Sequence, residues 1–166
     1  MAVRRFQLCL VLAASLLGGG APAKAAADRE PLLLGDDERI LVLAAHPDDE
    51  TLAAGGLIQE ARALDLPVRV CFFTMGDNNE IAALFTRRHP ALAPGPLRAS
   101  GQLRQNEALA AATQLGLSAE DVVFLGYPDV GTLVMWNHHW RTVPPYRSPL
   151  TRANAVPYDD ALTPGS

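Results

Sequence analysis

The stretch Arg39–Gly56, RILVLAAHPDDETLAAGG, decides the fold of this 166-residue chain. Its apolar first part, Arg39–Ala45, is typical of a strand buried on both faces. The part from Asp49 to about Leu64 reads as a helix. His46 and three carboxylates therefore stand where a strand ends and a helix begins. In open α/β sheets, functional groups gather at these carboxyl ends of strands.

Further elements follow in alternation. PVRVCFFT at 67–74 predicts a second buried strand, RASGQLRQNEALAAATQL at 98–115 a helix, and DVVFL at 121–125 a third strand. Strands that alternate with helices indicate right-handed βαβ units and a parallel sheet. Between them, MGDNNE reads as a turn and residues 81–85 as a short helical piece. Residues 87–101 read as a loop, because prolines interrupt them.

Residues 126–166 contain no convincing helix or strand pattern, and six prolines interrupt them. A structureless segment of this length is unusual in a compact domain. Three parallel strands would also leave sheet edges uncovered. We therefore expect residues 39–130 to form an incomplete domain core. Residues 131–166 are expected to be a Pro- and aromatic-rich, substrate-facing loop that leads to missing C-terminal elements.

Residues 1–25 have the layout of a secretory signal peptide: Arg4 and Arg5, an apolar run, then small residues with cleavage near Ala25. The alternative is a membrane anchor, but the apolar run is short for a span of roughly 20 residues. We predict a secreted or periplasmic protein with no stable membrane span after cleavage. Residues 26–38 would be a polar lead-in on the surface.

The composition excludes several classes of function. Removing Arg4, Arg5 and Lys24 from the 14 basic residues leaves 11 against 18 acidic residues, a formal charge of −7. This charge argues against a nucleic-acid partner. Lys24 is the only lysine, so a processed chain has no Schiff-base or P-loop lysine. Cys71, in an apolar run, is expected to be a packed thiol rather than a nucleophile.

The chemistry at His46 goes beyond helix capping. Aspartate suits an N-cap and proline the first helical position, but capping requires one acid and not three. Imidazole and carboxylate together suit zinc, and His46 and Asp49 are spaced to converge on one ion. Asp48 could then take a proton from a metal-bound water. A catalytic zinc site uses about three protein ligands, and the sequence offers no obvious third.

AAHPDDE followed by TLAAGG resembles the signature of the PIG-L/LmbE-like family of zinc-dependent N-deacetylases. FFTMGD, LRQNEALAAATQLG and VVFLGYPD are similar to later parts of that family, so the resemblance covers about residues 39–129. It implies a Rossmann-like three-layer α/β fold with a mainly parallel sheet. It also implies hydrolysis of N-acetyl groups, commonly on an N-acetylglucosamine moiety.

Carried over by position, the resemblance makes His46 and Asp49 ligands of Zn²⁺, or of another divalent metal such as Fe²⁺, and makes Asp48 the general base. Arg104 and Asp129 would line the substrate pocket. Two alternatives stay open. Arg104 could be a helix-surface charge that pairs with Glu107 or Glu120, and Asp129 could be a turn residue in YPDVG.

The family's third zinc ligand is a histidine in a later motif, which is not present before Ser166. His138 and His139 are the last histidines in the chain, but they follow the third strand too closely to match that motif. They are expected to lie in a substrate-facing loop with Trp136 and Trp140, with loop packing or zinc ligation as alternatives. Without a third ligand the 166-residue chain would be inactive.

The sequence thus predicts a metal-dependent hydrolase that deacetylates an N-acetylated sugar or glycoside. The alternative function is a non-catalytic exported module that binds sugars or a partner through its aromatic residues. A dinucleotide-binding domain is disfavoured because the first strand-to-helix turn lacks G-x-G-x-x-G. A serine hydrolase is disfavoured because G-x-S-x-G is absent. The sequence predicts no particular oligomeric state.

Overall fold

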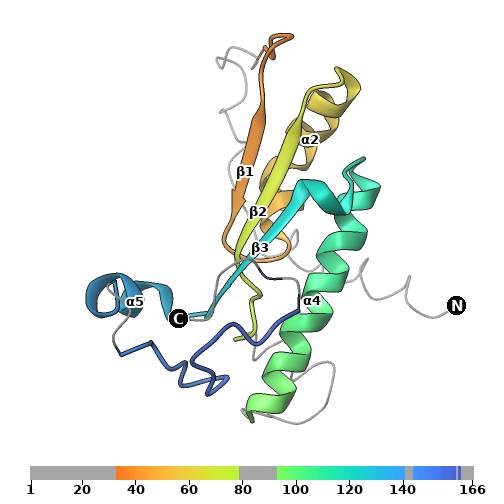
Figure 1. Ribbon diagram of the computed structural model, residues 1–166. Helices are drawn as coiled ribbons and strands as arrows, with labels where there is room; N and C mark the ends of the chain where they lie inside the picture. Colours follow the sequence, from red (N-terminus) through yellow and green to blue (C-terminus); the bar gives the residue numbers. More distant parts are fainter. Residues whose placement is uncertain (1–32, 79–92, 141–143, 160, 162–166) are drawn as a thin grey trace, which may run out of the picture. The chain divides into compact units, whose positions relative to one another are not determined.

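A computed structural model describes residues 33–78, 93–140, 144–159 and 161 (Figure 1). The chain divides into one unit over residues 1–33 and a second over Leu34–Ser166, and the elements below belong to the second. The predicted signal peptide and the short helical piece at 81–85 lie outside the described residues.

Three parallel strands form the sheet. β1 (Ile40–Ala44), β2 (Val68–Thr74) and β3 (Val122–Tyr127) lie in the order β1-β2-β3. Val42 is the partner of Val70, and Phe72 is the partner of Phe124. The predicted parallel sheet is confirmed, and the mixed α/β architecture is consistent with a Rossmann-like fold.

Two long helices connect the strands: α2 (Asp49–Ala63) follows β1, and α4 (Pro94–Gln114) follows β2. A short 3₁₀ helix, η1 (Ala119–Asp121), precedes β3. Because the spatial order of the strands is their chain order, right-handed crossovers place both helices on one face of the sheet. Figure 1 shows α2 and α4 on the same side of the strands.

The core lies between this sheet face and the helices. Every second side chain of β2 is buried, including Val70 and Phe72, as the two-residue period of a strand requires. Phe72 stacks on Phe124 of β3 with ring centroids 5.0 Å apart. Ile58 of α2 and Ala112 of α4 belong to the same buried cluster. This packing fixes the strand ends from which the candidate site is built.

The other face of the sheet is more open, so the prediction that the first strand is buried on both faces is wrong for the described residues. Leu41 and Leu43 of β1 are 62% and 61% exposed. The reason is topological, because neither crossover helix lies on that face. Cys71, also on this face, is half-buried. Burial raises the pKa of its thiol, which disfavours the nucleophilic thiolate.

The predicted loop over residues 87–101 is wrong from Pro94 onward, where α4 begins four residues before the expected start. Pro94 and Pro96 lie in the first turn of the helix. The first N–H groups of a helix have no partner within the helix, so proline there costs no hydrogen bond. The prolines that suggested a loop therefore mark a helix start.

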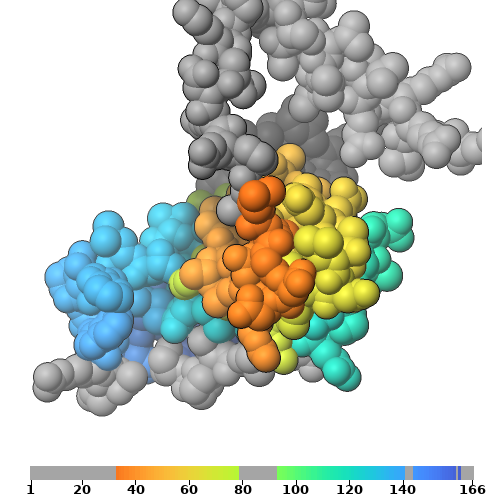
Figure 2. All heavy atoms as spheres, turned by 90° about the horizontal axis from the view of Figure 1, so that it is seen from above, coloured from red at the N-terminus to blue at the C-terminus, as the bar shows by residue number. Residues whose placement is uncertain are grey.

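A second correction concerns residues 126–166, where no helix was expected. Thr132–His138 form a two-turn helix, α5. Its apolar side chains do not give a buried face, since none of its residues is buried. Figure 2 shows α5, in blue, separated from α2, in yellow, by the orange residues that include β1, so α5 lies on the open side of the sheet.

Residues 144–159 contain turns and bends without a helix or strand, and α4 holds them in place. Arg98 of α4 donates to the carbonyl oxygen of Thr151 at 2.6 Å, and Gln105 donates to that of Asp159 at 2.9 Å. Among the described helices, none combines the length and apolar character needed to cross a bilayer.

Candidate functional site

The turn from β1 into α2 holds its carboxylates by hydrogen bonds. Glu50 is 1% exposed, and its two carboxylate oxygens accept from the Asp48 N–H at 2.9 Å and from the Thr51 hydroxyl at 2.7 Å. Asp48 is the N-cap with φ 135°, a region that non-glycine residues rarely adopt. Its side chain does not cap the helix and points elsewhere. Glu50 thus stabilises a strained turn that presents Asp48.

His46 lies between two carboxylates, one at each edge of its ring. Its Nδ1 is 3.7 Å from Oδ2 of Asp49, which also accepts the His46 N–H at 3.0 Å. Its Nε2 is 3.1 Å from Oδ1 of Asp129. The imidazole is therefore oriented from both sides, with 42% of the side chain exposed.

Asp129 follows β3 and connects loops that are far apart in the sequence. Its Oδ1 meets His46 and accepts the Val130 N–H at 3.1 Å, and its Oδ2 accepts the Asn78 N–H at 3.2 Å. The bond to Val130 is the local contact expected of a turn residue. The contacts with His46, after β1, and with Asn78, after β2, join the ends of these two strands to the end of β3 at the same edge of the sheet.

Arg104 of α4 reaches across to the same edge. Its guanidinium donates to the carbonyl oxygens of Gly76 at 3.0 Å and Pro47 at 2.6 Å, and it pairs with Oδ2 of Asp48 at 3.0 Å. Its partner is therefore Asp48, and the alternative pairing with Glu107 or Glu120 is not what the structure shows. A Cβ at Gly76, which has φ +60°, would lie 2.1 Å from the guanidinium, so only glycine leaves room for this contact.

The structure thus brings five predicted site residues to the carboxyl edge of the sheet: His46, Asp48, Asp49, Arg104 and Asp129. Sequence reasoning missed Gly76, whose signal was its place two residues after a predicted strand. It also missed the Arg104 contact with the Pro47 carbonyl, because a main-chain acceptor has no sequence signal.

His138 and His139 do not join this site. Within the part of the chain that the structure describes, no three His, Cys, Asp or Glu side chains group closely enough to hold a metal. Asp49 and Asp129 contact opposite edges of His46 and do not converge on one point. His139 instead lies beside the main-chain oxygen of Pro144, 2.8 Å from its Nδ1, and packs edge-to-face on Tyr146.

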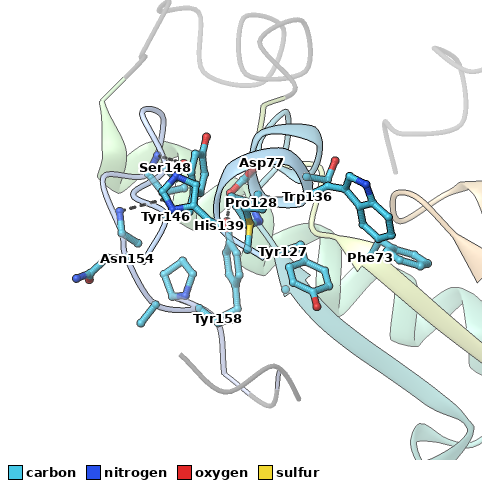
Figure 3. Close-up of a pocket in the computed structure, with 18 of the residues that line it drawn as sticks. Phe73, Asp77, Tyr127, Pro128, Trp136, His139, Tyr146, Ser148, Asn154 and Tyr158 are labelled. Carbon is cyan, nitrogen blue, oxygen red and sulfur yellow. Dashed lines mark hydrogen bonds between the residues drawn. The ribbon is translucent and has the colours of Figure 1, made fainter. Parts of the chain in front are cut away.

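A cavity of about 530 Å³ adjoins the site, between the open face of the sheet, α5 and residues 146–158. Figure 3 shows Phe73 and Trp136 together at one side of it, Tyr146 and His139 at the other, and Asp77 and Pro128 between them. His138 and His139 were both expected in a loop with Trp136 and Trp140. His139 lines this cavity with the two tryptophans, whereas His138 does not, and Trp136 and His138 lie in the helix α5.

Asp77 and Tyr158 form a buried pair that the sequence did not predict. Asp77 is 3% exposed and Tyr158 is 7% exposed, and the Tyr158 hydroxyl donates to Oδ2 of Asp77. Burial raises the pKa of Asp77, and burial followed by the charge of Asp77 raises the pKa of Tyr158. Oδ1 of Asp77 has no hydrogen-bond partner among the described residues.

The family model described as PIG-L, GlcNAc-PI de-N-acetylase, matches residues 41–142. The chain belongs to the PIG-L family. This confirms the resemblance inferred from AAHPDDE, and the match includes all five residues at the carboxyl edge of the sheet.

The chain is similar to several proteins that are named as sugar deacetylases. A 1D-myo-inositol 2-acetamido-2-deoxy-alpha-D-glucopyranoside deacetylase of Mycobacterium sp. (strain KMS) is 34% identical over 111 residues, 67% of this chain and 32% of that protein. The Mycolicibacterium smegmatis protein of the same name is 37% identical over 82 residues, 49% of this chain and 27% of that protein. The PIG-L chain described here spans about a third or less of the curated relatives it matches.

Proposed function

We propose that the protein is a metal-dependent hydrolase that removes the N-acetyl group from an N-acetylglucosamine-like sugar or glycoside. The observation that carries the proposal is the arrangement at His46: a histidine and carboxylate pair beside an arginine-held carboxylate, at the edge of the sheet where α/β proteins bind ligands. Membership of the PIG-L family and the names of the sugar deacetylase relatives support it.

His46 and Asp49 have the donor types and the separation that a zinc ion accepts. Two such ligands, each about 2.0–2.2 Å from the metal, lie at most about 4.3 Å apart. Nδ1 of His46 and Oδ2 of Asp49 are 3.7 Å apart, within that limit. We assign these two atoms as ligands of Zn²⁺ or of Fe²⁺. When bound, the metal would lower the pKa of a water and polarise the acetyl carbonyl.

Asp129 orients His46 for this role. When Nε2 carries the proton and donates to Oδ1 of Asp129 at 3.1 Å, the Nδ1 lone pair is directed at the side where Asp49 lies. A carboxylate behind a metal-binding histidine fixes its tautomer and makes it a better ligand. We therefore add to the predicted substrate-binding role of Asp129 a positioning role through His46.

Asp48 acts as the general base. Arg104 holds one of its oxygens, Oδ2, and the carboxylate is 56% exposed, so Oδ1 is directed to accept a proton from an attacking water. The water oxygen forms a bond to the acetyl carbon as its proton passes to Asp48. The C–N bond then breaks, and the amine of the sugar takes up a proton as acetate leaves.

The test is release of free amine from an N-acetylglucosaminide, followed with an amine-reactive fluorophore. The sequence predicted an inactive chain without a third protein ligand. We propose instead that His46 and Asp49 are enough to hold the metal, so we expect activity that disappears when a chelator removes the metal and returns when Zn²⁺ or Fe²⁺ is added back. Amine release that persists in chelator would overturn the metal-dependent mechanism. No amine release in the metal-loaded protein would overturn the deacetylase proposal.

A second candidate function is a non-catalytic exported module that binds sugars. The cavity favours it, because Trp136 and Trp140 are 64% and 68% exposed beside it, and sugar-binding sites use such rings. Sugar binding that survives metal removal, requires a tryptophan and is accompanied by no amine release would favour this function over hydrolysis.

We also propose that residues 1–25 are a signal peptide and that the protein is secreted or periplasmic. The support is the sequence alone, with Arg4 and Arg5 before an apolar run and small residues near Ala25. Mass spectrometry of the exported protein tests this. A mature N-terminus near residue 26 is expected, and a retained Met1 would contradict the proposal.

A further inference from the structure

The cavity beside residues 46–50, which we name the catalytic turn, is lined by aromatic rings from four parts of the chain. Phe73 comes from the open face of β2, and Tyr127 from the end of β3. Trp136 and Trp140 come from α5 and the residues after it, with ring centroids 4.4 Å apart. Tyr146 and Tyr158 come from the following segment. These rings would give a ligand in the cavity aromatic contacts on several sides.

Several polar side chains of the lining already serve the chain's own hydrogen bonds. Ser148 Oγ accepts the Thr151 N–H at 3.2 Å, and Thr151 Oγ1 accepts the Ala153 N–H at 3.4 Å. Asp77 accepts from Tyr158, and its unpartnered Oδ1 is covered from solvent. The cavity therefore offers a ligand apolar contact with few polar anchors, the usual character of a small-molecule pocket.

The wall of the cavity adjoins the catalytic turn through neighbouring residues. Pro128 and Asp77 line it. The next residues along the chain, Asp129 and Asn78, are joined by a hydrogen bond, and Asp129 contacts His46. Consecutive Cα atoms are about 3.8 Å apart, so the cavity wall is one residue removed from the partner of His46.

We infer that this cavity is the aglycone site of the enzyme, and that it selects N-acetylated glycosides whose aglycone is a flat apolar ring, such as an aryl group. This inference rests on the proposed deacetylase function. Trp136 is the residue that decides the preference, because it is 64% exposed and stands beside Phe73 at the cavity (Figure 3). An aryl ring that covers it gains both burial and ring-to-ring contact.

The test is isothermal titration calorimetry on the Zn²⁺-loaded Asp48→Asn variant, which is expected to keep the metal and to bind substrate without turnover. The probes are the phenyl and methyl 2-acetamido-2-deoxyglucopyranosides, in both anomers, and N,N′-diacetylchitobiose, whose second ring is hydroxylated. We expect one phenyl anomer to bind at least about tenfold tighter than its methyl analogue, equal to about 1.4 kcal/mol. We expect chitobiose to bind no better than the methyl glycoside.

The Trp136→Ala variant is expected to lose the phenyl preference. Leu133→Ala is the matched control, because Leu133 lies on the same helix, is 69% exposed and does not line the cavity. It should keep the preference. Equal affinity for phenyl and methyl glycosides, tighter binding of chitobiose than of the phenyl glycoside, or equal effects of the two variants would each overturn the inference.

Failure of this inference and failure of the proposed function give different results. A phenyl preference that depends on Trp136, without amine release in the metal-loaded protein, would support the cavity assignment and overturn the deacetylase proposal. Amine release from phenyl and methyl glycosides with equal KM would support the deacetylase and overturn the aglycone site.

Discussion

The catalytic turn and the aromatic cavity are neighbours that the chain builds in opposite ways. The turn concentrates His46, Asp48, Asp49 and Glu50 within five residues, and hydrogen bonds or ion pairs hold each side chain. The cavity collects rings from residues 73 to 158, and two of its largest rings are mostly exposed. The first region is preorganised for chemistry, and the second has apolar surface left for a ligand.

Because the turn is fixed by hydrogen bonds and the cavity has exposed rings, we expect the two regions to affect different steps of the reaction. Fixed polar groups stabilise charge that develops in a reaction, because they do not have to reorganise when it occurs. Exposed aromatic rings gain free energy only when something covers them. We therefore expect changes in the turn to act on metal affinity and kcat, and changes in the cavity to act on binding and KM.

The largest effect is expected from Asp48→Asn. An amide cannot take the proton of the attacking water, so kcat should fall by about 10²–10⁴, the usual contribution of a general base. Metal content should stay unchanged, because Asp48 is not a proposed ligand. Asp65→Asn, at the end of α2, is the control and should keep full activity. Unchanged kcat in Asp48→Asn would remove the base assignment.

The second effect concerns Asp129, the residue behind His46. Asp129→Ala removes the acceptor for Nε2, and loss of such a partner typically costs about 10–100-fold in metal affinity. Competition with a chromogenic chelator measures this. Asp129→Asn keeps an acceptor oxygen, so its metal affinity should fall less than that of Asp129→Ala. If both variants bind metal as the parent does, Asp129 does not position His46.

The third prediction concerns Arg104, whose removal should lower both the free energy of unfolding and kcat, whereas a matched arginine elsewhere should affect only the free energy of unfolding. Arg104→Ala removes hydrogen bonds to Pro47, Gly76 and Asp48, and loss of a bond to a charged group costs about 1.5–3 kcal/mol of unfolding free energy. It should also lower kcat. Arg62→Ala is the matched control, since Arg62 also donates to two main-chain carbonyl oxygens, those of Leu66 and Gly116, and has no contact with the turn among these bonds. Urea unfolding and turnover of both variants are compared, and equal kcat values would contradict the support role.

The smallest effect is expected from Asp77, beside the cavity, and concerns the pH dependence of the free energy of unfolding. Burial raises the pKa of Asp77, so the folded chain binds this proton more tightly than the unfolded chain. The contribution of Asp77 to the free energy of unfolding therefore falls as the pH rises from about 3.9, the ordinary pKa of aspartate, to the raised pKa of Asp77 in the folded chain. The unfolding free energy of the parent minus that of Asp77→Asn should fall with pH, by at most about 1.4 kcal/mol per pH unit. A constant or rising difference would contradict the buried pair.

The catalytic turn was predictable because its information is local. Strand periodicity, proline at the turn and three carboxylates after His46 gave both the elements and the candidate residues. Arg104 and Asp129 came from the family resemblance, but the partner of Arg104 and the contact of Asp129 with His46 needed the structure. They depend on how β3 and α4 return to the end of β1.

The cavity was much less predictable. Trp136, His139 and Trp140 were expected to act together, but α5 was missed because its short sequence shows no buried face. Phe73 was predicted to lie in a second buried strand, but it is on the open face of the sheet and lines the cavity. The Asp77–Tyr158 pair joins residues 81 positions apart, a separation that no local pattern reveals.

The most direct test of the catalytic turn is the zinc affinity of the protein beside His46→Ala and His139→Ala, one histidine from each region. We predict zinc binding that is lost in His46→Ala and unchanged in His139→Ala, since of these two histidines it is His46 that stands beside Asp49. Equal zinc binding in the parent and His46→Ala, or loss in His139→Ala alone, would contradict a metal site at the catalytic turn.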